Sequence, residues 1–351
     1  MKNEVTHSGR IPSLDGWRGI AILLVLLDHV QIALVGRYRW SWTETGQHGV
    51  TIFFVLSGFL ITSKLLERQI NLRDFYMRRF FRLMPAAWTY LAVIALLTLA
   101  SGTRFTSIAD VRACLLFYRN FVRFAHNSVT GHFWSLSLEE QFYLVWPSVL
   151  LLAGLRHSRW IAGGGAVACA LYRWVFWAHY DSHGPNFQSQ VRADALLLGC
   201  LVALLLAEPR LLSACRRLSQ LLALPALAVF IYCIVRFHNL LPLSESAAIA
   251  ILIAACVLHP GSLFVRILSF RPLAWLGVIS YSVYLWQELF IHLGSGTGAV
   301  HLVSIFIAIP AFALASYYFI ERPCIRFGNR LIGKRFVHLP ETITPTLSES
   351  L

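Results

Sequence analysis

Long apolar segments recur along the whole chain, and they constrain its fold more than any other feature of the sequence. A helix needs about 20 apolar residues to cross the hydrocarbon core of a bilayer, where it satisfies its own backbone hydrogen bonds. The pattern therefore predicts an all-α, polytopic membrane protein with about ten transmembrane helices. The expected spans are 19–36, 49–66, 84–101, 133–155, 160–179, 193–208, 219–236, 244–260, 272–294 and 299–320.

Composition and charge favour the same fold. Hydrophobic residues make up 57% of the 351 residues and charged residues 13%, whereas soluble domains carry about 25% charged residues. With a cytoplasmic amino terminus, most Lys and Arg flank cytoplasmic helix ends, so both termini are expected inside. Asn3 and Glu349 then lie in the cytoplasm and the loop around His126 lies outside. The net charge of +13 reflects this topology and anionic lipid, and predicts no nucleic-acid partner. The seven cysteines lack C-x-x-C spacing, so neither a metal site nor a disulfide framework is expected.

The first apolar segment, LDGWRGIAILLVLLDHV, carries Arg18 at its entrance and His29 deep inside. Eleven residues of helix turn through about 1100°, so the two side chains share one face to within about 20°, about 16 Å apart. Half of the hydrocarbon core is about 15 Å, which places His29 near the midplane if Arg18 lies at the surface. Because an ionisable group at that depth is costly, His29 is a candidate functional residue. A structural histidine bonded to a neighbouring helix is the alternative.

The densest basic cluster precedes the third span, in MRRFFRLMP, where Pro85 is expected to open that span. Arg79 and Arg82 are three residues apart and therefore neighbours on one helical face, with Arg78 beside them. Arginine forks suit phosphate oxygens, which makes the cluster a candidate phosphate site. Ordinary anchoring by positive residues at the cytoplasmic surface is the other explanation.

The segment HFWSLSLEEQFYLVWP places Glu139 and Glu140 close to or within lipid depth, where a carboxylate needs a partner or a chemical role. The spacing of His132, Ser135 and Glu139 predicts a polar patch on one side of the fourth span. Acidic residues in the first turn of a helix capped by Ser137 would explain the same pattern without any chemistry. Two further charges, Arg173 and Asp194, fall in the fifth and sixth spans, and the sequence alone names no partner for Arg173.

Seven blocks in order carry a resemblance that covers the chain from Leu14 to about Arg326. They are LDGWRGIAILLVLLDH, GVTIFFVLSGFLIT, MRRFFRLMP, HFWSLSLEEQFYLVWP, RADALLLG, ISYSVYLW and ERP. Together they resemble the membrane-bound acyltransferase-3 family, whose bacterial members O-acylate sugars of surface glycans. The resemblance implies a transmembrane domain over 1–326, with 327–351 as a short cytoplasmic tail, in the cell (inner) membrane.

Motif by motif, the resemblance assigns residues to the reaction. The family's arginine and histidine fall on Arg18 and His29, and its acidic position falls on Glu139 with Glu140 beside it. These four residues are the predicted catalytic set, with His29 as base or transiently acylated nucleophile. The R-x-x-R pair falls on Arg79 and Arg82, which with Arg78 are the predicted donor-binding residues.

The resemblance further implies an acyl-CoA donor, most often acetyl-CoA, entering from the cytoplasm as co-substrate, and no permanently bound cofactor. The acceptor would be a carbohydrate or glycolipid, with membrane lipid as the surroundings. Many members have histidine after Tyr-Leu-Trp, whereas this chain has Gln287. The hydrolase-like extracytoplasmic domain of some members is also absent from this sequence, so transfer is expected to finish in the membrane part or with a partner.

Two other classes of function fit the sequence. A transporter or flippase of a lipid-linked glycan would also use ten spans and intramembrane charges. Consumption of acyl-CoA by the purified protein separates an enzyme from such a transporter. A membrane scaffold would leave His29, Arg173 and Glu139 without a purpose.

Overall fold

The computed structural model describes residues 11–35, 45–67, 71–102, 105–122, 129–176, 188–236, 243–294 and 303–336. All regular structure in these ranges is helical, which confirms the predicted all-α class. The termini and the loop around His126 lie outside the described residues, so their sides of the membrane stay predictions. The elements are α1 (Pro12–Val35), α2 (Thr45–Leu65), α3 (Leu72–Ser101), α4 (Ile108–Leu115), η1 (Arg119–Phe121), α5 (Phe133–Phe176), α6 (Ser189–Leu206), α7 (Pro209–Arg236), α8 (Ser244–Leu258), α9 (Leu263–Leu268), α10 (Arg271–Gly294), η3 (Ser304–Ala308), α12 (Ile309–Ser316), η4 (Tyr317–Glu321) and α13 (Arg322–Phe336).

The distribution of side chains is that of a protein in lipid. Large apolar side chains such as Leu99, Leu152 and Phe319 face outward, whereas charged residues such as Asp194 and Glu321 are buried. Lipid tails satisfy the outer apolar surface, and polar groups are kept inside the helix bundle. Among the described residues, five helices are long and apolar enough to cross a membrane, which supports a multi-pass protein. They are Thr45–Leu65, Leu72–Ser101, Ser189–Leu206, Pro209–Val235 and Ile305–Gly333.

Three boundaries differ from the sequence expectation. The third helix begins at the Asn71 cap, whose side chain accepts from the Arg73 amide, so Pro85 lies inside α3 rather than at its start. The fourth and fifth spans meet in α5, whose helical path breaks at Gly154, where φ is 68°. The last span continues past Glu321 into α13, so the start of the predicted tail is helical. A hydropathy pattern does not detect arginine-rich helix ends that lie outside lipid. This explains the earlier start of α3 and the continuation of the last span into α13.

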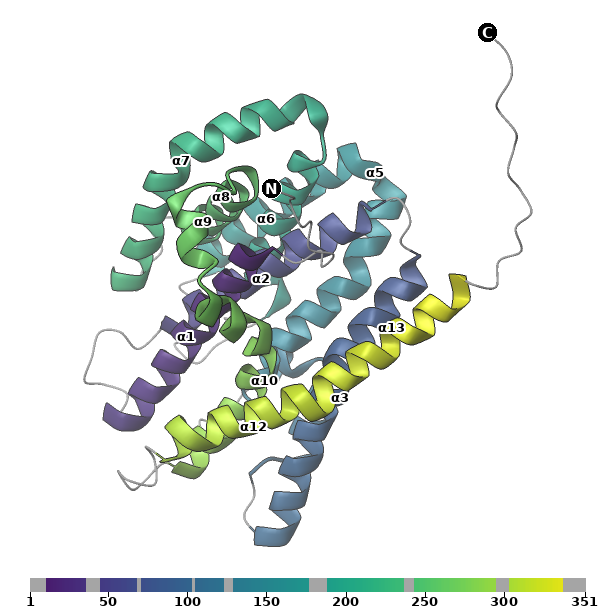
Figure 1. Cartoon of the computed structure of the whole chain (residues 1–351), viewed down its shortest axis with the longest axis vertical. Helices are drawn as coiled ribbons and strands as arrows, with labels where there is room; N and C mark the ends of the chain where they lie inside the picture. Colours follow the sequence, from purple (N-terminus) through teal and green to yellow (C-terminus); the bar gives the residue numbers. More distant parts are fainter. Residues whose placement is uncertain are drawn as a thin grey trace, which may run out of the picture.

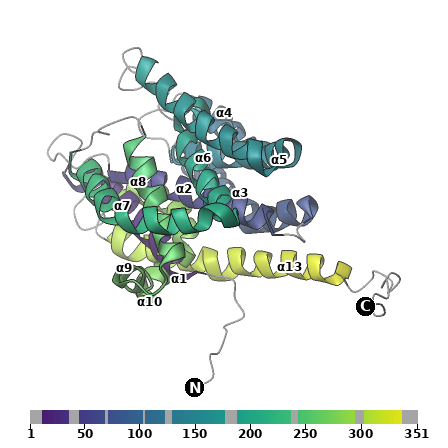
Figure 2. The ribbon, with the colours of Figure 1, turned by 90° about the horizontal axis from the view of Figure 1, so that it is seen from above.

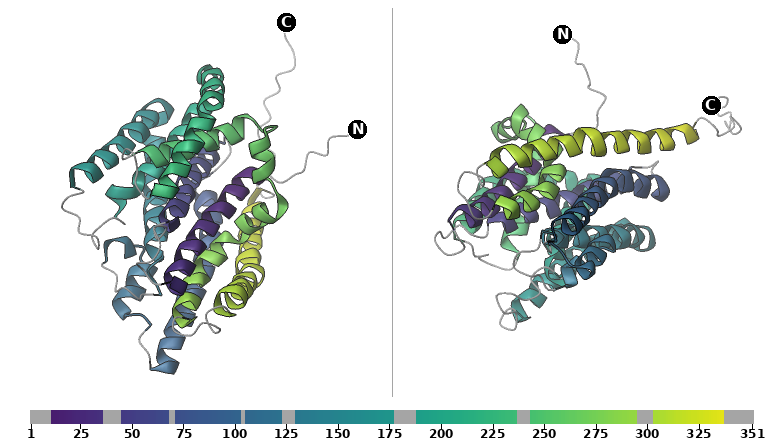
Figure 3. Two further views of the ribbon diagram at one scale, coloured as in Figure 1. Left: turned by 90° about the vertical axis from the view of Figure 1, so that its left-hand side faces the viewer. Right: turned by 90° about the horizontal axis from the view of Figure 1, so that it is seen from below.

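Two close helix crossings hold the centre of the bundle, where α1 packs against α10 and α2 packs against α6 (Figures 1 and 3). A Cβ atom at Gly58 of α2 would overlap the carbonyl oxygen of Leu196 in α6. A Cβ atom at Gly277 of α10 would likewise overlap the carbonyl oxygen of Asp15 in α1. Small residues let membrane helices approach this closely, and the result is a rigid frame around α1 and α10.

Helices α3 and α13 lie side by side along the molecule (Figures 1 and 2). The Arg78 guanidinium donates to Asn329 Oδ1 at 3.0 Å, and the Phe81 and Phe327 rings pack with centroids 5.5 Å apart. This pairing brings the basic amino-terminal part of α3 next to the basic helix α13.

Candidate active site

Helix α1 presents His29 to α10. The Nε2 atom of His29 lies 3.6 Å from Oε2 of Glu288, with the two side chains 26% and 12% exposed. The other ring nitrogen, Nδ1, is buried and forms no hydrogen bond to the described residues. A third group, His132 just before α5, packs against Tyr284, which lies one turn before Glu288 on α10. We refer to His29, His132 and Glu288 as the histidine cluster.

A second cluster, the arginine cluster, consists of Arg79, Glu139 and Glu140. The Arg79 Nη2 atom lies 3.8 Å from Glu139 Oε2, and its Nε atom lies 3.5 Å from Glu140 Oε1. The Arg79 guanidinium also lies 3.1 Å from the ring centroid of Tyr143, a cation–π contact. The Ser57 hydroxyl donates to Glu139 Oε1 at 2.8 Å. The cation is therefore held between two carboxylates and an aromatic ring.

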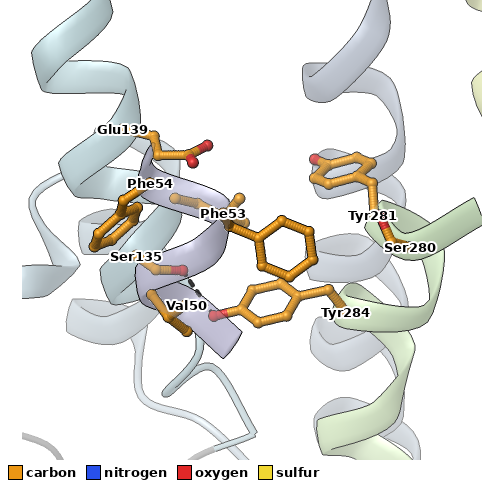
Figure 4. Close-up of a pocket in the computed structure, with 9 residues that line it drawn as sticks. Val50, Phe53, Phe54, Ser135, Glu139, Ser280, Tyr281 and Tyr284 are labelled. Carbon is orange, nitrogen blue, oxygen red and sulfur yellow. Dashed lines mark hydrogen bonds between the residues drawn. The ribbon is translucent and has the colours of Figure 1, made fainter. Parts of the chain in front are cut away.

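A small cavity of about 70 Å³ lies beside the arginine cluster, with Glu139 in its lining (Figure 4). Glu139 lies at one end of it, and Tyr284 lies at the other, where its hydroxyl is 2.7 Å from the Ser135 hydroxyl. Tyr284 and Glu288 are four residues apart on α10 and so face the same way. The cavity therefore lies between Glu139 and the turn of α10 that precedes Glu288. The lining residues are Val50, Phe53, Phe54, Ser135, Leu136, Glu139, Ser280, Tyr281 and Tyr284.

The structure brings some predicted site residues together and separates others. Arg18 and His29 both lie on the uninterrupted helix α1, as their predicted shared face requires. The Arg18 guanidinium donates to Asp15 Oδ1 at 2.8 Å. Arg79 points at the two glutamates rather than at the exposed surface of α3. Arg78 and Arg82 are exposed, which leaves these two as the accessible members of the predicted donor site.

Three residues outside the predicted catalytic set belong to the site: Glu288, His132 and Tyr284. A signal for Glu288 was present, because a carboxylate in an apolar span needs a partner. Its pairing with His29 depends on how α10 crosses α1, which the spacing within one helix does not contain. Gln287 is fully buried, and its amide forms no hydrogen bond to the described residues.

The intramembrane cation Arg173 has its partner in α6. Its guanidinium donates to both Asp194 oxygens, at 3.3 and 3.1 Å, and to the Val191 carbonyl at 2.8 Å. Ser246 also donates to Asp194. The ion pair ties α5, α6 and α8 together and is separate from both clusters, which gives it a structural role.

An acyltransferase domain family model matches residues 11–321 of the chain. The chain is 32% identical over 381 aligned positions to the putative peptidoglycan O-acetyltransferase YrhL of Bacillus subtilis (strain 168), covering 96% of this chain and 58% of that protein. It is 29% identical over 368 positions to the peptidoglycan O-acetyltransferase OatA of Listeria monocytogenes, and the alignment covers 93% of this chain and 58% of that protein. It is 30% identical over 372 positions to a putative O-acetyltransferase of Staphylococcus aureus (strain COL), and the alignment covers 95% of this chain and 60% of that protein. The chain thus spans less than two thirds of the length of these relatives. No solved structure matches it.

Proposed function

The chain belongs to the acyltransferase family whose domain matches residues 11–321, and from that premise we propose that it is an integral-membrane O-acyltransferase. It transfers an acyl group, in the simplest case acetyl, from cytoplasmic acyl-CoA to a hydroxyl of a carbohydrate or glycolipid acceptor. The names of the relatives, peptidoglycan O-acetyltransferases, support a cell-wall glycan as the acceptor. The apolar helices support a membrane location, which we take to be the cell (inner) membrane.

The contact between His29 and Glu288 is the observation that carries this proposal. A carboxylate that faces one imidazole nitrogen holds the proton there and leaves the lone pair on the other nitrogen. The 3.6 Å contact is longer than a hydrogen bond; if it closes, Nε2–H would donate to Glu288 and Nδ1 of His29 would be the proton acceptor. General bases in the resting state often make such loose contacts, which tighten when substrate binds.

The reaction then runs as a direct transfer. The acceptor oxygen attacks the thioester carbonyl carbon, a C–O bond forms and the C–S bond breaks. The hydroxyl proton moves to His29 Nδ1 and from there to the departing sulfur of CoA. Transient acylation of Nδ1 is the other route that histidine chemistry allows. A quench experiment that recovers acyl-histidine distinguishes the two.

The donor is expected on the cytoplasmic side of α3. Arg78 and Arg82 are exposed there, and guanidinium forks bind phosphate oxygens bidentately. Arg79 supports the site in a different way, because it neutralises Glu139 and Glu140 beside the cavity.

The test is acyl transfer by purified protein in vesicles, from radiolabelled acetyl-CoA to purified peptidoglycan. We expect His29→Gln to lower the rate by about 10²- to 10⁴-fold, because an amide cannot take up the proton. The matched control is His157→Gln, since His157 is exposed and contacts only the Ala153 carbonyl four residues earlier. Near wild-type turnover in His29→Gln would refute the mechanism. A glycan transporter, the other class of function, would leave the thioester intact in the wild type.

A further inference from the structure

His132 is a buried polar residue whose ring has no hydrogen-bond partner among the described residues. The residue is 4% exposed, and neither Nδ1 nor Nε2 forms a hydrogen bond to the described residues. More than nine in ten buried polar groups in proteins are hydrogen-bonded, and leaving one unbonded is costly. A ring that is buried and unsatisfied on both nitrogens therefore needs a reason to stay there.

The ring is held in place by its neighbours. It packs edge-on against Tyr90 and Tyr284, with centroids 5.3 and 5.4 Å away, and against Phe133 at 5.0 Å. The backbone is fixed as well, because the His132 carbonyl accepts from the Tyr284 and Ser135 hydroxyls at 3.1 and 3.2 Å. Rotation to find another partner is thus prevented, and the nitrogens stay directed at the same space.

The His132 ring packs against the helix that carries Glu288, the partner of the proposed base. Tyr284, one turn before Glu288 on α10, contacts the ring and lines the cavity. His29 is the most exposed member of the histidine cluster, so a ligand would approach from its side.

We propose that His132 binds the acceptor, and that the histidine cluster is a subsite for the hydroxyl groups of a sugar ring. A neutral imidazole offers one donor and one acceptor, and an ionised carboxylate offers only acceptors. Neighbouring hydroxyls of a sugar supply both kinds of group, so one hydroxyl bonds His132 while the next is deprotonated by His29. This inference rests on the proposed acyl transfer and names the residue that positions its acceptor.

The variant His132→Phe tests the subsite, because it keeps a ring in the aromatic surroundings and removes both nitrogens. Replacing an unbonded polar group by an apolar one of the same shape does not destabilise a protein, so the variant should fold. We expect its KM for peptidoglycan fragments to rise about 10-fold, the effect of one lost hydrogen bond of about 1.4 kcal/mol. The KM for acetyl-CoA should not change. His132→Asn, which keeps donor and acceptor atoms, should recover part of the loss.

The control is His48→Phe. His48 is equally buried but bonds Glu245 at 2.8 Å, so its loss should lower the melting temperature and leave the acceptor KM unchanged. Binding of the same fragments, followed by intrinsic fluorescence, provides a readout that does not need turnover. If the wild type turns over and His132→Phe has the wild-type KM, the subsite is refuted alone. If the wild type neither binds the fragments nor consumes acetyl-CoA, the proposed function is refuted and the subsite with it.

Discussion

The two polar clusters at the centre of the bundle differ in the number of charged groups that each brings together. In the arginine cluster, Arg79 contacts Glu139, Glu140 and the ring of Tyr143, and Ser57 completes the set. In the histidine cluster, His29 approaches Glu288 at 3.6 Å, and the ring nitrogens of His132 form no hydrogen bond to the described residues.

This difference predicts which cluster stabilises the fold and which one takes part in the reaction. A cation that lies 3.5 to 3.8 Å from two carboxylates ties together the helices that carry these charges, although Arg79 Nε and Glu140 Oε1 form no hydrogen bond to the described residues. Groups such as the His132 ring, held by packing and left unbonded, keep the capacity to bind a substrate, because the substrate supplies the missing partners. We therefore expect substitutions in the arginine cluster to act mainly on stability, and substitutions in the histidine cluster to act mainly on turnover.

The largest effect on stability is expected from Arg79→Ala. The change leaves Glu139 and Glu140 facing each other without their cation, and breaking a buried ion pair costs about 3–5 kcal/mol. Because Arg79 is 19% exposed, the lower end of that range applies. Thermal unfolding in detergent measures the loss, and Glu140→Gln in the same chain should recover part of it. Wild-type stability in Arg79→Ala would show that the arginine cluster is not a structural unit.

Glu288→Gln should act in the opposite way. An amide cannot hold the His29 tautomer as a carboxylate does, so we expect kcat to fall about 100-fold, the usual consequence of a misplaced catalytic group. The KM for acetyl-CoA and the melting temperature should stay at their wild-type values, and Glu288→Asp should restore part of kcat. A loss of stability without a loss of kcat would make the contact with His29 structural.

On the donor side, Arg82→Ala should weaken acyl-CoA binding about 10-fold, the effect of one charge-assisted hydrogen bond. Arg82→Lys should recover only part of the affinity, because lysine keeps the charge and loses the fork. The control is Lys64→Ala, an exposed cation that pairs with Glu67 at the end of α2. Unchanged affinity in Arg82→Ala would leave the basic end of α3 as a membrane anchor.

The smallest effect is expected from Ser57→Ala. Its hydroxyl donates to Glu139 at 2.8 Å, and one such bond contributes about 1 kcal/mol of stability. The melting temperature should fall slightly, with kcat and both KM values unchanged. A larger change in kcat than in stability would place Ser57 in the reaction and weaken the distinction between the clusters.

The sequence predicted the helical class, since it follows from local patterns; ten spans were expected, and among the described residues five helices are long and apolar enough to cross a membrane. The motifs singled out His29, Arg79, Glu139 and Glu140 as candidates. The pairing of His29 with Glu288 lay beyond prediction, because the two residues are far apart in the chain and meet only where α1 crosses α10. The same holds for Arg79. Its sequence pattern predicts a contact with phosphate, whereas in the structure its side chain contacts two carboxylates. Spacing within a helix determines which residues share a face. The groups that this face contacts depend on how the helices pack against one another.

The central claim is that the donor binds at one place and proton transfer happens at another. Titration of acetyl-CoA against purified His29→Gln tests it most directly, alongside the turnover of the same sample. The account predicts wild-type affinity for acetyl-CoA together with a turnover reduced by at least about 10²-fold. Affinity that is lost in step with turnover would contradict it, because donor binding and proton transfer would then depend on one and the same group.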